Sequence, residues 1–127
     1  MATLFTKIIN GEIPCHKVAE TNEFLAFLDI MPVKRGHVLV VPKQEIDYIF
    51  NVEDDQLGRM MIFTKKIAKQ IEKAFPCNRI GVTVIGLEVP HAHIHLIPID
   101  KLDDMNFAKP KLQLDHMELA EIAESII

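Results

Sequence analysis

Half of this chain's six histidines lie in one short stretch, residues 91–95, which reads His-Ala-His-Ile-His. In an extended strand successive side chains point to opposite faces, so His91, His93 and His95 would share one face. The intervening Ala92 and Ile94 are apolar, as a face packed against a core requires. A core has no need of three adjacent imidazoles. The stretch therefore predicts a β-strand with one packing face and one functional face.

Metal binding is one use for these imidazoles. Two histidines at positions i and i+2 of a strand can both reach a Zn²⁺ ion, with a third ligand from His37 or Glu88. Three alternate residues, however, span roughly 13 Å. They cannot all reach one ion at about 2.1 Å. A metal would therefore leave one histidine of the run unexplained.

Covalent catalysis at phosphorus is the other use. A neutral imidazole offers a free nitrogen as a nucleophile, and neighbouring imidazoles can donate hydrogen bonds to anionic oxygens. The chain has no Walker-type glycine loop and no GxGxxG motif. The phosphate would have to be held by the histidine strand and its neighbours.

Composition excludes several other classes of function. The formal net charge of −4 and the lack of a Lys/Arg run argue against broad nucleic-acid binding. Cys15 and Cys77 are far apart and form no CxxC motif, so neither a disulfide framework nor a cysteine zinc site is expected. Neither a signal peptide nor an apolar run long enough to span a membrane is recognisable. We expect one domain over residues 1–127, in the cytoplasm.

The order of predicted elements favours an α+β fold. A short helical turn over residues 3–11 precedes strands and one long helix over 53–75, with Asn51 as its N-cap and Pro76 as its stop. A final helix is expected from Asp115, with Glu118 completing a capping pair. The predicted strands cover residues 17–20, 24–28, 37–41, 79–85 and 91–98.

Several blocks, in the same order, resemble the histidine triad family of nucleotide hydrolases and transferases. They are residues 5–14 (FTKIINGEIP), 25–30 (LAFLDI), 36–43 (GHVLVVPK) and the histidine run itself. The resemblance implies an antiparallel sheet with one long helix packed on it. It also implies a homodimer with a sheet continuous across the two-fold axis, and a reaction through a nucleotidyl-histidine intermediate without a cofactor.

The resemblance also implies a role for individual residues. His93 would attack the α-phosphorus, His95 and His37 would line the phosphate pocket, and His91 would orient the centre through its backbone carbonyl. Asp29 would accept the ribose hydroxyls of a purine nucleotide, where the alternative is a simple turn residue. The residues that would enclose the purine, each of which could equally be plain core, are Leu4, Phe5, Ile8, Phe27, Ile30 and Leu39.

The chain departs from the family pattern at two places. Many relatives carry a CxxC that holds a structural zinc with two later histidines, but here Thr3 and Thr6 stand at those positions and Gln44-Glu45 replace a histidine. No metal is therefore expected. The connection over residues 86–90 also lacks the amide and hydroxyl side chains that relatives place near the leaving group. Glu88 stands there instead, either as a surface charge or as a carboxylate that attracts an amine and repels polyphosphate.

These observations predict a hydrolase of purine nucleoside phosphoramidates or related nucleotides, which releases a nucleoside monophosphate from His93. Two alternatives remain open. One is a nucleotide-binding module with little catalysis, which the missing amide and hydroxyl favour. The other is a dinucleoside polyphosphate hydrolase.

Overall fold

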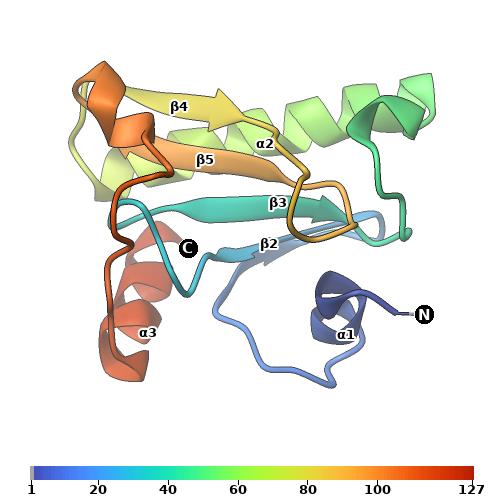
Figure 1. The fold of residues 1–127 in the computed structure, drawn as a ribbon, viewed down its shortest axis with the longest axis horizontal. Helices are drawn as coiled ribbons and strands as arrows, with labels where there is room; N and C mark the ends of the chain where they lie inside the picture. Colours follow the sequence, from blue (N-terminus) through green and yellow to red (C-terminus); the bar gives the residue numbers. More distant parts are fainter. Residues whose placement is uncertain (1) are drawn as a thin grey trace.

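One five-stranded antiparallel sheet, in the order β1-β2-β3-β5-β4, organises the computed structural model, which describes residues 2–127 (Figure 1). This architecture confirms the predicted α+β class with one long helix on the sheet. The elements, in chain order, are α1 (Leu4–Ile9), β1 (Lys17–Glu20), β2 (Phe24–Leu28), β3 (Val38–Pro42), the 3-10 turn η1 (Ile49–Asn51), α2 (Asp54–Ala74), β4 (Arg79–Thr83), β5 (Ile94–Ile99), the 3-10 turn η2 (Leu102–Met105) and α3 (His116–Ile126).

The strand register creates two chemically different faces on the sheet. Paired residues of antiparallel strands project to the same side. Phe27 pairs with Leu39 and Leu39 with His95, so these three form a row across one face. Ala26, Val40 and Ile94 form the corresponding row on the opposite face. One face is therefore entirely apolar, while the other carries a histidine.

The apolar face is covered by the two longer helices. Figure 1 shows α2 running along the sheet, and α3 contacts β1 and β2. The helix α2 buries Met60, Ile67 and Ile71 against Ile94 and its neighbours. Its polar N-terminus is capped by the Glu53 carboxylate, which accepts hydrogen bonds from two backbone N–H groups. Burial of this face supplies most of the core.

The N-terminal caps of α2 and α3 can be compared with the sequence predictions. The predicted N-cap Asn51 is wrong, because this residue belongs to the preceding η1 turn and Glu53 caps α2 instead. The predicted start of the last helix is confirmed: the Asp115 carboxylate accepts the backbone N–H of Glu118. The helix α3 lies on the side of the sheet away from Phe27 and His95.

The other face of the sheet is only partly covered, by the short helix α1. Thr3 caps this helix by accepting the backbone N–H of Thr6. The Phe5 ring packs edge-on against Phe27 with a centroid separation of 5.6 Å. A six-residue helix covers little area, so the rest of this face stays open for a site.

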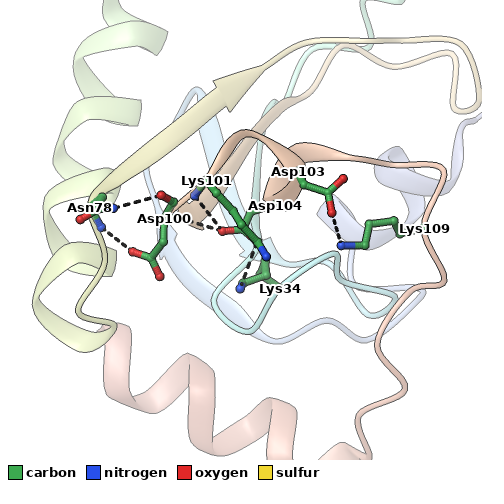
Figure 2. A network of polar contacts seen from close by, with 7 residues as sticks. All are labelled: Lys34, Asn78, Asp100, Lys101, Asp103, Asp104 and Lys109. Atoms are coloured by element: carbon green, nitrogen blue, oxygen red, sulfur yellow. Dashed lines mark hydrogen bonds and ion pairs between the residues drawn. The ribbon is translucent and has the colours of Figure 1, made fainter.

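The segment between β5 and α3 returns over the open face. Its anchor is the buried Asp104 carboxylate, which accepts the backbone N–H groups of Asp100 and Lys101 and lies 3.5 Å from Nζ of Lys34 (Figure 2). Farther along, the backbone N–H of Leu112 donates to the carbonyl of Pro32. The returning segment is thus tied to the loop between β2 and β3. Within residues 2–127, the helices are too short or too polar to cross a membrane.

Candidate active site

A cavity of about 510 Å³ opens on the partly covered face of the sheet. His93, His95 and Glu88 line it. The residues predicted to bind the nucleotide line it too: Leu4, Phe5, Ile8, Phe27, Asp29, Ile30 and Leu39. The rings of His37 and His91 lie behind this surface, with exposed fractions of only 1% and 0%. The fold therefore gathers residues from both ends of the chain around one cavity.

The protonation of the His93 ring follows from one hydrogen bond. Its Nδ1 atom lies 2.8 Å from the backbone carbonyl oxygen of His91, which can only accept. Nδ1 must therefore carry the proton, and in the neutral ring Nε2 keeps a free lone pair. Phe5 packs edge-on against the ring at 5.0 Å and His95 lies at 4.9 Å. His93 is thus a positioned imidazole with Nε2 available as a nucleophile.

His37 and His95 form a second, linked pair. The backbone N–H of Val33 donates to Nδ1 of His37 at 3.0 Å, so the proton of the neutral His37 ring lies on Nε2. That Nε2–H donates to Nδ1 of His95 at 2.9 Å. The neutral His95 ring must then carry its own proton on Nε2. His95 accordingly offers an N–H donor at the cavity.

Burial keeps both of these rings uncharged. Loss of water around the ring, together with the neighbouring His95, lowers the pKa of His37 to about 3. Desolvation, together with His93, lowers the pKa of His95 to about 4. At neutral pH both rings are neutral, so the pair supplies a directed hydrogen bond rather than positive charge.

The first histidine of the run behaves differently from the other two. The strand β5 begins only at Ile94, and His91 lies in the preceding turn. The predicted strand over residues 91–98 is therefore wrong at its start, and the three rings do not share one strand face. Nε2–H of His91 donates to the carbonyl of Pro42, while only its backbone carbonyl reaches the His93 ring.

A hydrogen-bond network behind the cavity was not foreseen from the sequence. Nδ1 of His91 lies 2.9 Å from Oγ1 of Thr3. The hydroxyl of Thr6 donates to Oε1 of Glu45 at 2.6 Å, and the backbone N–H of Thr3 donates to the same oxygen at 2.8 Å. Hydrogen bonds from Thr3 and Thr6 to Glu45 thus join α1 to the loop after β3.

Asp29 lines the cavity next to the buried His37. One carboxylate oxygen accepts the backbone N–H of Met31 at 2.9 Å, and Oδ2 lies 3.7 Å from Nε2 of His37. Burial raises the pKa of this carboxyl, while the Met31 N–H, His93 and a lysine at the cavity, Lys111, oppose that shift. The side chain is about one quarter exposed, so a ligand in the cavity can reach it.

Asp29, His37 and His95 are close enough to raise the question of a metal, since one ligand atom from each lies within 4.8 Å of the others. The hydrogen bonds do not fit such a site. Nε2 of His37 carries a proton because Nδ1 is occupied by the N–H of Val33. Binding a cation there would break that bond and reverse the tautomer of a buried ring. These three side chains are therefore arranged to fix the tautomers of His37 and His95 rather than to coordinate a metal.

Two further residues at the cavity come from the returning segment. The Phe107 ring lies edge-on to His95, with centroids 5.0 Å apart, and Lys111 lines the cavity beside it. Sequence reasoning missed both, because residues 100–114 show no periodicity or motif that would attach them to the histidines. Only the fold brings them to the site.

Comparisons with known proteins identify the family of this chain. The model of the HIT domain matches residues 10–102. A HIT-like protein of Borreliella burgdorferi is 35% identical, over 97% of this chain and 94% of its own length. An adenosine 5'-monophosphoramidase of Schizosaccharomyces pombe is 36% identical, over 77% of this chain and 74% of its own. The crystal structure of a HIT-like protein of Bartonella henselae superposes with a TM-score of 0.84 at 31% identity, covering 98% of this chain and 93% of that one. The chain belongs to the HIT domain family.

Proposed function

We propose that this protein hydrolyses purine nucleoside phosphoramidates, or closely related nucleotides, through a covalent intermediate on His93. The observation that carries the proposal is the hydrogen bond from Nδ1 of His93 to the His91 carbonyl, which leaves Nε2 free for attack. Relatives named adenosine 5'-monophosphoramidase, from Schizosaccharomyces pombe and Candida albicans, support a hydrolase of this type.

The reaction has two displacement steps at phosphorus. Nε2 of His93 forms a bond to the α-phosphorus while the P–N bond to the amine breaks. The amine leaves with the bonding electron pair and takes a proton from water. A water molecule then attacks phosphorus, the P–Nε2 bond breaks, and the nucleoside monophosphate departs as the water loses a proton to solvent. The His93 ring returns to its starting tautomer.

The surrounding residues would stabilise charge in both steps. The Nε2–H of His95 donates to a non-bridging phosphoryl oxygen, where the displacement concentrates negative charge. The His91 carbonyl stabilises the positive charge that develops on the phosphorylated His93 ring. Both groups are held by hydrogen bonds before substrate binds, so little reorganisation is required.

The nucleoside would occupy the apolar part of the cavity. Its base would contact Phe27 and Leu39 of the sheet and Phe5 of α1. Ile30 would cover it at the rim, where the Ile30 side chain is 61% exposed. Such exposed apolar surface suits contact with a flat base. The ribose hydroxyls would donate to the Asp29 carboxylate.

We also propose that a second copy of the chain pairs with β4. This strand ends the sheet, and the side chains of Val82, Met61 and Ile62 are 50%, 46% and 72% exposed on β4 and α2. Light scattering should give the mass of a dimer, and Val82→Lys should shift it toward the monomer. A monomeric parent protein would contradict this assembly.

The function is tested by removing the His93 ring. His93→Ala should abolish turnover of an adenosine phosphoramidate yet bind the monophosphate within about tenfold of the parent protein, a change of up to about 1.4 kcal/mol. Radiolabelled substrate quenched in base should leave label on the parent and none on the variant. Turnover at the parental rate in His93→Ala would refute the mechanism. Parent protein that binds nucleotide but never acquires label would favour the binding module, which the lack of amide and hydroxyl side chains over residues 86–90 suggests.

A further inference from the structure

The charges that line the cavity do not suit a phosphate anion without help from outside the histidine run. Two carboxylates, Asp29 and Glu88, line it. The buried His37 and His95 are neutral, and His93 must be neutral to act as a nucleophile. Phosphoryl oxygens would meet hydrogen-bond donors and two negative charges. Among the lining residues that the structure describes, Lys111 carries the one fixed positive charge.

Lys111 is placed where its charge acts on the residues around the phosphate site. It lowers the pKa of both Asp29 and His37, so its ammonium lies within electrostatic reach of each. Nζ donates to the carbonyl of Phe107 and lies 5.6 Å from the centre of that ring. Within residues 2–127 it forms no ion pair. An ammonium has three N–H donors, so two remain for a ligand.

The segment that carries Lys111 is held against the loop that joins β2 to β3. Near the beginning of this segment, the Asp104 carboxylate lies 3.5 Å from Nζ of Lys34 (Figure 2). Beyond Lys111, the N–H of Leu112 donates to the carbonyl of Pro32. The same loop over residues 29–37 presents Asp29 and His37. The positions of the Lys111 ammonium and of His37 are therefore linked through the backbone.

We infer that Lys111, which lies outside the stretch matched by the HIT domain model, binds the phosphoryl oxygens of the nucleotide and supplies the positive charge that the neutral imidazoles do not. This inference rests on the proposed function, because it takes the cavity to be a nucleotide site. Its consequence is specificity: the site would favour 5'-phosphorylated nucleosides over nucleosides. A charge-assisted hydrogen bond to phosphate is stronger than one from a neutral donor.

The test compares two ligands that differ only in the phosphate. Calorimetry would measure binding of adenosine 5'-monophosphate and of adenosine to the parent protein, Lys111→Met and Lys111→Arg. Lys109→Met is the matched control, because it removes the same charge from the same segment but does not line the cavity. Lys111→Met should weaken monophosphate binding by about tenfold or more and leave adenosine binding unchanged. Lys111→Arg and Lys109→Met should bind both ligands nearly as the parent does.

Three results would overturn the inference. If Lys111→Met binds the monophosphate as tightly as the parent, the ammonium does not contact phosphate. If both ligands weaken equally, Lys111 acts through the packing of Phe107 rather than through charge. In either case the proposed function stands, because the parent protein still binds nucleotide. If the parent binds neither ligand, the proposed function fails and the inference fails with it.

Discussion

Nε2 of His37 lies 2.9 Å from Nδ1 of His95, and through this hydrogen bond the backbone determines which nitrogen of His95 carries the proton. The N–H of Val33 can only donate, so it fixes the tautomer of His37, and His37 then fixes that of His95. His37 does not line the cavity, but its hydrogen bond places the proton of His95 on Nε2, the atom that can donate to the substrate. His37 is in this sense a positioning residue.

Replacing His37 should therefore change the tautomer of His95. In His37→Ala, Nδ1 of His95 loses its donor, and the ring becomes a mixture of two tautomers. Nitrogen chemical shifts of the ring should report one tautomer in the parent and a mixture in the variant. We expect kcat/KM for a phosphoramidate to fall by roughly ten- to a hundredfold, the loss of one donor to a developing charge. Adenosine binding should be unchanged, and identical nitrogen shifts in the two proteins would contradict the relay.

Local sequence patterns predict the secondary structure of this chain well because its core is regular. The run Val38-Leu39-Val40-Val41, rich in β-branched residues, is a fully buried strand. Met60, Ile67 and Ile71 recur at helical spacing and lie on the buried side of α2, although Met61, in the same apolar pattern, is exposed. The histidine alternation was misleading at one end. His91 precedes the strand because its neighbour Ala92 donates its N–H to Ile46, outside the sheet, while pairing with β3 begins at Ile94.

The parts of the site that sequence patterns could not predict depend on contacts between distant segments. Lys111 reaches the cavity because Asp104 and Leu112 anchor an irregular segment, and no local period encodes that path. Thr3 and His91 are 88 positions apart, yet their side chains are 2.9 Å apart. The individual residues look like an ordinary helix cap and a strand histidine. Only the tertiary fold makes them partners.

The buried imidazoles make stability depend on pH. The pKa of His37 is about 3 and that of His95 about 4 in the folded protein. In the unfolded chain both are about 6.5. Below that value the unfolded chain binds protons that the folded protein does not, so stability is full above pH 6.5 and falls as the pH drops toward 4. The slope is up to about 1.4 kcal/mol per pH unit for each ring.

Replacing one of these histidines should remove its contribution to the pH dependence of the free energy of unfolding. Urea denaturation between pH 6 and 4.5 should give His37→Gln a shallower decline than the parent, by about 1.4 kcal/mol per pH unit. The carboxylates titrate in both proteins, so their contributions cancel when the two free energies of unfolding are subtracted. Above pH 7 the two curves should run parallel, because His37 is neutral in both states there. Equal slopes in the acid range would mean that the folded His37 ring accepts a proton readily.

The turn before His37 requires glycine. Gly36 has a φ of +91°, and an added Cβ would lie 3.0 Å from both Phe75 and Pro98. Gly36→Ala should therefore destabilise the protein by about 2 kcal/mol or more, from backbone strain and overlap together. Gly58, inside α2, has nothing within 4 Å of the same atom. Gly58→Ala should instead stabilise by roughly 0.5–1 kcal/mol, because alanine favours the helix. Thermal unfolding of both variants checks the contrast, and equal shifts would contradict it.

Glu88 lies at the exposed mouth of the cavity, where the leaving group would depart. Its carboxylate would repel a polyphosphate leaving group and tolerate an amine. Glu88→Gln should therefore lower the preference for adenosine phosphoramidate over diadenosine polyphosphate, measured as a ratio of kcat/KM. We expect a change of only a few fold, because solvent screens an exposed charge. Glu121→Gln, an exposed change on α3, is the matched control. An unchanged ratio in Glu88→Gln would assign this carboxylate to the solvated surface.

The hydroxyl of Thr3 joins α1 to the histidine turn, because it contacts both Thr6 and His91. It accepts the backbone N–H of Thr6 as the cap of α1, and it donates to Nδ1 of His91, whose other nitrogen is bound to the Pro42 carbonyl. Thr3→Ala would remove the cap, at about 1 kcal/mol, and would leave Nδ1 of His91 with only the Thr6 hydroxyl at 3.5 Å, at about 1–3 kcal/mol. We expect a loss of roughly 2–3 kcal/mol in urea denaturation. Thr3→Ser keeps the hydroxyl and should lose less than half as much. Equal losses in the two variants would show that the methyl group, rather than the hydroxyl, joins α1 to the histidine turn.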